Sequence, residues 1–222
     1  MGTMIGDPPN ILIASASGYT FAEFLMYALP VVVVVWFVVM MMIRVMFRQE
    51  FQTPPKRAKV LMKMDENSVI KNQVVLTRSI WTLGIIIVLF FVHGLLHVPA
   101  AFIALFGAAL LLLLVSPVYT MHSILKKTEL TVLLFFASLF VLVGGLEQAG
   151  VLEYIATFII SGAEQHLILT ALIILWVTAI LSSILDNVPM TIAMVPVLAY
   201  LEASGVAGAN LFWWALVFGV GF

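Results

Sequence analysis

Long runs of apolar residues, separated by short polar stretches, follow one another along the chain. Two of them, Val31 to Met42 and Ile85 to Val92, contain no polar residue. The strands of a membrane barrel alternate apolar with polar residues, so uninterrupted runs favour helices. A helix of about 20 residues crosses a hydrocarbon core about 30 Å thick, and the chain has room for about six or seven such segments. The pattern predicts an all-α fold, a polytopic membrane helix bundle.

The apolar runs divide the chain into separate expected elements. Pro99 suits a first helical turn, so the segments on either side of His97 and Val98 are predicted to form a hairpin. Val151 to Ser161 is too short to span, and we expect it at the interface or packed against other helices. The other predicted segments are Phe21–Phe47, Ile80–Leu96, Pro99–Val115 and Leu130–Leu146, with a last one starting near Asn210.

The stretch from Leu167 to Tyr200 is too long for one span. As a single helix it would measure about 51 Å at 1.5 Å per residue, whereas the hydrocarbon core is only about 30 Å thick. Pro189 removes a backbone donor and clashes with the preceding turn, so a break is expected between Leu185 and Pro189. This leaves a crossing up to Leu185 and a discontinuous second helix over Met190–Leu201.

Composition supports the membrane class. The chain is 64% hydrophobic and 9% charged, whereas soluble domains have about 45–50% apolar and about 25% charged residues. It has no cysteine, which excludes disulfides and thiolate metal sites. MGTMIGDPPN has no basic region before an apolar stretch, so no signal peptide is expected. The chain stops inside the apolar sequence WWALVFGVGF, from which we expect a piece of a longer protein.

The basic residues are concentrated in one interval. Eight of the ten Lys and Arg residues lie between Arg44 and Arg78, and the positive-inside rule places this interval in the cytoplasm. A nucleic-acid patch is the alternative, but topology and contact with anionic lipid are the favoured interpretation beside a membrane helix. Residues 48–78 are therefore predicted to form a cytoplasmic basic linker, interrupted at Thr53-Pro54-Pro55.

The sequence ILDNVP contains the first candidate site. Asp186 is the only charged residue between Leu167 and Tyr200, and a carboxylate at the centre of a membrane helix costs about 2.5–3.5 kcal/mol on insertion scales. At a helix break, free amides and carbonyls offer partial charges, while Asp186 and Asn187 supply oxygen ligands. The alternative is an Asp/Asn cap on a helix at the interface.

GDPPN, near the amino terminus, has similar chemistry. Gly6 permits an unusual backbone, the two prolines prevent a helix from running across the stretch, and Asp7 and Asn10 are polar ligands. Alone it is as readily an ordinary surface turn. Together with the later break, it matches the pattern of internally repeated transporters.

Other polar residues are less specific. His93 and His97, four residues apart, could hold a metal, but no third ligand is near in sequence, and an interfacial pair is favoured. Glu147 follows a predicted span and is interpreted as a boundary residue. No nucleophile with a base, catalytic carboxylate pair or metal cluster has convincing spacing, so an intramembrane enzyme is not favoured.

Three stretches together resemble one family. TMIGDPPNILIASASG, LLFFASLFVLVGGLEQAGVLE and SSILDNVPMTIAMVPVL are similar to the ion transporter superfamily, which contains arsenite permeases, sodium/proton antiporters, the melanosomal P protein and citrate and dicarboxylate carriers. The GDPPN form is closest to the arsenite, antiporter and P-protein branch. The resemblance implies two inverted repeats, each with a re-entrant element and a broken helix, around a site at the membrane midplane.

The resemblance also implies which residues form the site and how the chain divides. In the first repeat these are Gly6, Asp7, Pro8, Pro9 and Asn10, and in the second they are Asp186, Asn187, Pro189 and Thr191. Residues 1–47 would end the first repeat, 48–78 would link the repeats, and 79–222 would form an incomplete second repeat. The matching elements would lie before Met1 and after Gly221, so each half of the site would lack its partner.

We therefore expect a multi-pass integral protein of the plasma membrane that acts as a secondary active ion transporter. Two carboxylates repel an anion unless they are protonated, which favours a cation, a proton-coupled step or neutral arsenite. Na⁺ or H⁺ is the expected coupling ion, with no other cofactor. Alternatives are a citrate, dicarboxylate or other anion permease, and a non-transporting subunit. Expected partners are lipid, the small ion and a second copy or another chain that completes the site, but not nucleic acid.

Overall fold

The computed structural model describes residues 2–52, 70, 72–118, 120, 122, 124, 126 and 129–221. Over these residues the secondary structure consists of helices joined by turns and bends, without a strand. The predicted all-α class is confirmed. Thr53-Pro54-Pro55 and most of the basic linker lie outside the described residues.

Within the described part, four helical segments are long and apolar enough to cross a membrane: α2 (Phe21–Met46), α5 (Gln73–Leu96), α8 (Leu130–Gln148) and residues His166–Ile184 of α9 (Val151–Ile184). Shorter apolar helices account for much of the remaining hydrophobic sequence: α6 (Ala100–Val115), Val151–Gly162 of α9, α10 (Asn187–Ala203) and α11 (Ala209–Gly221). The helices α1 (Pro8–Ser17) and α3 (Arg48–Gln52) are also present.

The chain divides into two compact units. One contains Thr3–Leu25 and Thr128–Phe222, and the other contains Met26–Lys127. Compact units are defined by contacts, whereas the expected division at residues 47 and 78 concerns sequence repeats. That division stays a prediction.

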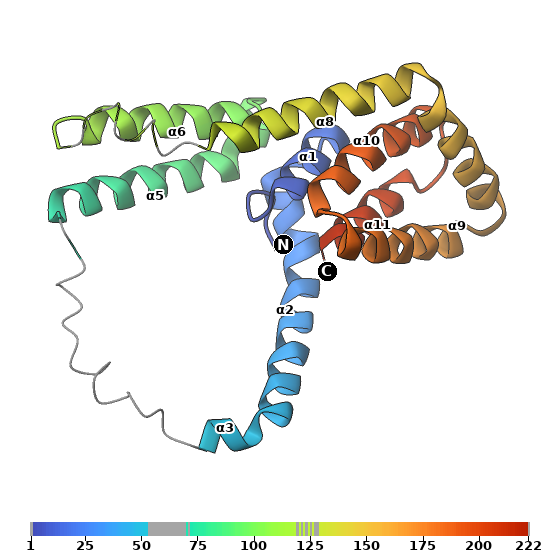
Figure 1. Cartoon of the computed structure of the whole chain (residues 1–222), viewed down its shortest axis with the longest axis horizontal. Helices are drawn as coiled ribbons and strands as arrows, with labels where there is room; N and C mark the ends of the chain where they lie inside the picture. The colour runs from blue at the N-terminus through green and yellow to red at the C-terminus, as the bar shows by residue number, and fades with distance from the viewer. Residues whose placement is uncertain are drawn as a thin grey trace. The chain divides into compact units, whose positions relative to one another are not determined.

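In the unit of residues 26–127, α5 and α6 lie side by side as the predicted hairpin (Figure 1). His97 ends α5 in the left-handed conformation, with φ 53°. α5 begins earlier than predicted, at Gln73 rather than Ile80. The Asn72 side chain accepts hydrogen bonds from the amides of Val74 and Val75, at 3.0 and 3.1 Å, and caps this earlier start.

In the other unit, the long apolar stretch is broken as predicted. α9 ends at Ile184, Leu185 is extended (φ −94°, ψ 161°), and Asp186 is the N-cap of α10. α10 begins at Asn187 rather than Met190, with Pro189 as its third residue. A proline fits there because the amides of a first helical turn have no partner within the helix. A second irregularity, at His166 (φ −148°, ψ 77°), separates the short first part of α9 from its span.

The same unit has a closely packed core in which α11 contacts α9 and α10, and α1 contacts α10 and α11 (Figure 1). Gly219 lets α11 approach α9, because a Cβ there would lie 1.9 Å from Thr178 Oγ1 and 2.7 Å from the Leu175 carbonyl oxygen. This contact holds the C-terminal end of α11 beside the last turns of α9.

Candidate functional site

The predicted ILDNVP motif forms the junction between α9 and α10. Asp186 is exposed, and its Oδ1 accepts a hydrogen bond from the Val188 amide at 3.5 Å. This distance is at the outer limit of a hydrogen bond, so the cap is weak and leaves most of the carboxylate available. Asn187 is half-buried, and its Oδ1 accepts a hydrogen bond from Ser182 Oγ at 2.6 Å.

Thr191 and Pro189 lie within the first turns of α10. Thr191 is fully buried, and its hydroxyl donates to the Asn187 carbonyl oxygen at 2.8 Å. Pro189 is half-buried. In this structure both residues support the backbone of the junction, and the Thr191 hydroxyl proton is already used within the helix.

The predicted GDPPN motif forms the start of α1. Gly6 is exposed in the turn before the helix, and its amide donates to the Thr3 carbonyl oxygen at 3.2 Å. Asp7 is the half-buried N-cap and makes no side-chain capping bond. Pro8 and Pro9 occupy the first turn, so they begin the helix where no amide donor is needed.

Asn10 has a different environment from the two aspartates. Its side chain is 1% exposed, and Nδ2 donates to the Thr3 carbonyl oxygen at 3.2 Å. This bond ties the first turn of α1 back to the preceding segment. Asn10 therefore closes the turn that presents Asp7.

The fold brings the two motifs together, although 179 positions separate them in the numbering of Asp7 and Asp186. α1 packs against α10 (Figure 1). Partial burial is the main cause that raises the pKa of the Asp7 carboxyl group, and the negative charge of Asp186 raises it further. Both aspartates are N-caps, so each lies at the positive end of a helix dipole. Two like charges on packed helices would be stabilised by a bound cation.

Ser182 is a further residue of this junction that the sequence pattern did not indicate. This residue is 8% exposed, lies in the last turn of α9 and donates to Asn187. Its hydroxyl is also 3.4 Å from the Val220 carbonyl oxygen of α11. The sequence signal was a pair of serines directly before the break, but Ser183 instead bonds the Ile180 carbonyl oxygen and is exposed.

The other candidates do not form a comparable site. The described residues contain no group of three or more His, Asp or Glu side chains that could hold a metal. His97 lies past the end of α5, in the left-handed region. Neither it nor His93 belongs to such a group among the described residues.

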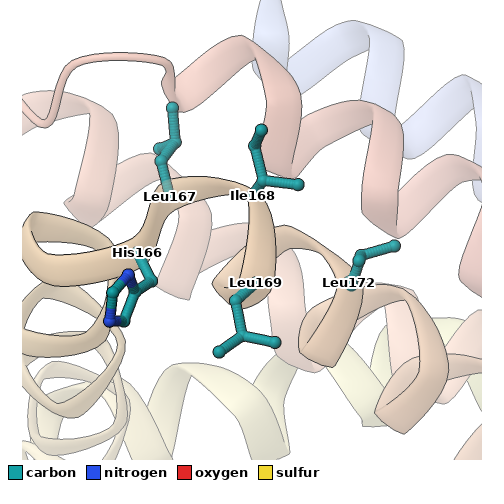
Figure 2. Close-up of a pocket in the computed structure, with 5 residues that line it drawn as sticks. All are labelled: His166, Leu167, Ile168, Leu169 and Leu172. Carbon is teal, nitrogen blue, oxygen red and sulfur yellow. The ribbon is translucent and has the colours of Figure 1, made fainter.

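Two hollows in this unit have mainly apolar walls. One, of about 270 Å³, lies between α1, α8 and α10, with Glu147 as its charged lining residue. The other, of about 630 Å³, lies at the bend of α9. Figure 2 shows the His166 ring directed away from Leu167, Ile168 and Leu172, and His166 is the one polar side chain among the lining residues of this hollow.

A known protein family matches the chain over a range that includes both motifs. The sequence pattern of the citrate transporter family matches residues 1–219. The chain is 32% identical over 222 residues to a 46 kDa membrane protein of Mycobacterium leprae, covering 99% of this chain and 51% of that protein. It is 33% identical to an uncharacterized transporter of Mycobacterium tuberculosis, with the same coverage.

A human relative is also similar. The P protein of Homo sapiens is 32% identical over 169 residues, which cover 72% of this chain and 20% of that protein. No solved structure matches the chain. The chain spans about half the length of the mycobacterial relatives. Together with the four candidate spans, these matches make it an integral membrane protein and confirm the family resemblance of the three stretches.

Proposed function

Because the chain belongs to the citrate transporter family, we propose that it acts in secondary active transport, coupling the movement of a small solute across the membrane to Na⁺ or H⁺. The main supporting observation is that Asp7 and Asp186 occupy the N-cap positions of two helices, α1 and α10, that pack against each other. The uncharacterized transporters among its relatives support the same class.

In this proposal Asp186 is the principal coupling residue, Asn187 is a ligand, and Asp7 assists from the other motif. Asp186 is exposed and only weakly capped, so its oxygens are accessible. A cation or proton bound there would reduce its repulsion of Asp7. Binding of one would exclude the other, which couples two fluxes through one carboxylate.

The substrate proposal is arsenite efflux or Na⁺/H⁺ antiport. Neutral arsenite and small cations avoid the repulsion that a bare anion would meet from the two carboxylates. Citrate is the second candidate, because the matching family is described as citrate transporters. Citrate would need the carboxylates to be protonated or covered by a cation. Flux of Na⁺, H⁺, arsenite and citrate in liposomes containing the protein would separate these candidates.

The decisive variant is Asp186→Asn, which removes the charge and nearly preserves the shape. It should abolish coupled flux while expression and insertion stay close to normal. Glu129→Gln is the matched control, because it makes the same chemical change at an exposed carboxylate before α8. Normal coupled flux with unchanged pH dependence in Asp186→Asn would reduce the residue to a helix cap and overturn the assignment.

The proposal also includes a partner and a location. Each motif lies at a helix start, and we propose that a second copy or another chain contributes to the complete site in the plasma membrane. Crosslinking in intact membranes and fractionation of cells test these two points. If the purified chain catalyses coupled flux as a monomer, the partner is unnecessary.

A further inference from the structure

Ser182 links three helix ends that surround the proposed coupling residue. It lies in the last turn of α9, hydrogen-bonds the first residue of α10, and is 3.4 Å from a carbonyl oxygen in the last turn of α11. We propose that Ser182 is a positioning residue that holds the Asn187 side-chain oxygen in place for Na⁺. This inference rests on the proposed function, since it concerns the same site.

The hydrogen bond itself is the first argument. At 2.6 Å, the Ser182–Asn187 contact is short for an O–H···O bond, and Ser182 is 8% exposed. Water therefore competes weakly for the hydroxyl, and the bond restricts rotation of the Asn187 side chain. An amide oxygen has two lone pairs, so Asn187 Oδ1 retains one for a cation while it accepts from Ser182.

The surroundings of Asn187 show that its backbone is held as well. Thr191 Oγ1 donates to the Asn187 carbonyl oxygen at 2.8 Å, so one residue is fixed through both its main chain and its side chain. Outer-shell hydrogen bonds of this kind orient the groups that contact an ion. A ligand held in advance also loses less conformational freedom when the ion binds.

The third helix explains why Ser182 is enclosed. Gly219 allows α11 to approach α9 at Leu175 and Thr178, and this approach brings the Val220 carbonyl oxygen to the Ser182 hydroxyl. Ser183, its neighbour in sequence, is exposed and bonds only within its own helix turn. The two serines therefore form a matched pair in which one faces the junction.

The test uses Na⁺ as the probe and purified protein. Thermal unfolding is followed as Na⁺ replaces choline at constant ionic strength, and the Na⁺ concentration giving half of the maximal stabilisation is measured. Ser182→Ala should raise this concentration about 10-fold or more. Ser183→Ala should leave it unchanged, and Ser182→Thr, which keeps the hydroxyl, should restore it. A merely structural serine would lower the melting temperature without changing the Na⁺ dependence.

A double variant tests whether Ser182 acts through Asn187. If it does, adding Ser182→Ala to Asn187→Ala should cause little further change in the half-stabilising Na⁺ concentration. Independent, additive effects would overturn the inference, as would an unchanged Na⁺ response in Ser182→Ala or no response in the unmodified protein. If Asp186→Asn abolishes coupled flux while any of these results is found, the proposed function stands and only the role of Ser182 is rejected.

Discussion

The two aspartates of the candidate site are both helix N-caps, yet neither is held tightly by its own helix. Asp7 makes no side-chain capping bond, and Asp186 makes one at 3.5 Å. A capping side chain that makes a hydrogen bond shorter than this stabilises a helix by about 1 kcal/mol. These carboxylates are therefore placed where capping residues are expected, but their oxygens remain available to a ligand.

At the scale of single residues, we predict that Asn187→Ala weakens the apparent affinity for the coupling ion without abolishing turnover. The variant removes one neutral oxygen, whereas the Asp186 carboxylate remains. Coupled flux measured against ion concentration should show a higher half-saturating concentration and a maximal rate that is largely kept. Gln148→Ala, which removes an exposed amide at the end of α8, is the control. Loss of turnover in Asn187→Ala would instead make Asn187 essential.

Single residues also show which parts of the site could be predicted from the sequence and which could not. Asp186 and Asn187 were identified because a lone charge in an apolar stretch is costly. Ser182 was not identified, because its neighbour Ser183 has the same side chain and the sequence does not distinguish the two. Which of them faces Asn187 depends on the phase of α9 and on the position of α11, and that position depends on a glycine contact remote in sequence.

At the scale of helices, the close approach of α11 to α9 gives a stability prediction. In a helix with free space, Gly→Ala is favourable by about 0.5–1 kcal/mol. At Gly219 the added Cβ would meet Thr178 Oγ1 and the Leu175 carbonyl oxygen, so we expect a net destabilisation of about 1–3 kcal/mol.

Gly145→Ala is the matched control, because nothing lies within 4 Å of the Cβ it would add in α8. Thermal unfolding in detergent should show a lower melting temperature for Gly219→Ala, and an equal or higher one for Gly145→Ala. Equal behaviour of both variants would mean that α11 does not pack closely against α9.

Helix boundaries were predictable where a strong physical limit applied. The break near Asp186 followed from a length that no bilayer accommodates, and the structure confirms it. The start of α5 was placed seven residues too late, at Ile80 instead of Gln73, because charged and polar residues suggested a linker. There the local cap of Asn72 decides the boundary, which hydropathy does not detect.

At the scale of the whole molecule, composition alone predicted the membrane class, since the apolar fraction exceeds what a soluble domain of this size can bury. Composition does not predict that the two polar motifs lie close together. Each motif is an ordinary turn by itself, and the family resemblance was the reason to expect them at one site. The packing of α1 against α10 now provides a physical reason.

The last prediction concerns topology. Eight of the ten Lys and Arg residues lie between Arg44 and Arg78, so this interval should face the cytoplasm. α5 then crosses the membrane, and the turn at His97 should face the opposite side. Because the chain has no cysteine, a single introduced one can be labelled without background.

Lys59→Cys, which lies outside the described residues, should therefore resist an impermeant maleimide applied to intact cells. His97→Cys should react under the same conditions, and both should react after the cells are lysed. The opposite labelling would reverse the orientation of the protein. Labelling of both positions in intact cells would mean that α5 does not cross the membrane, because the two sites would then share one aqueous side.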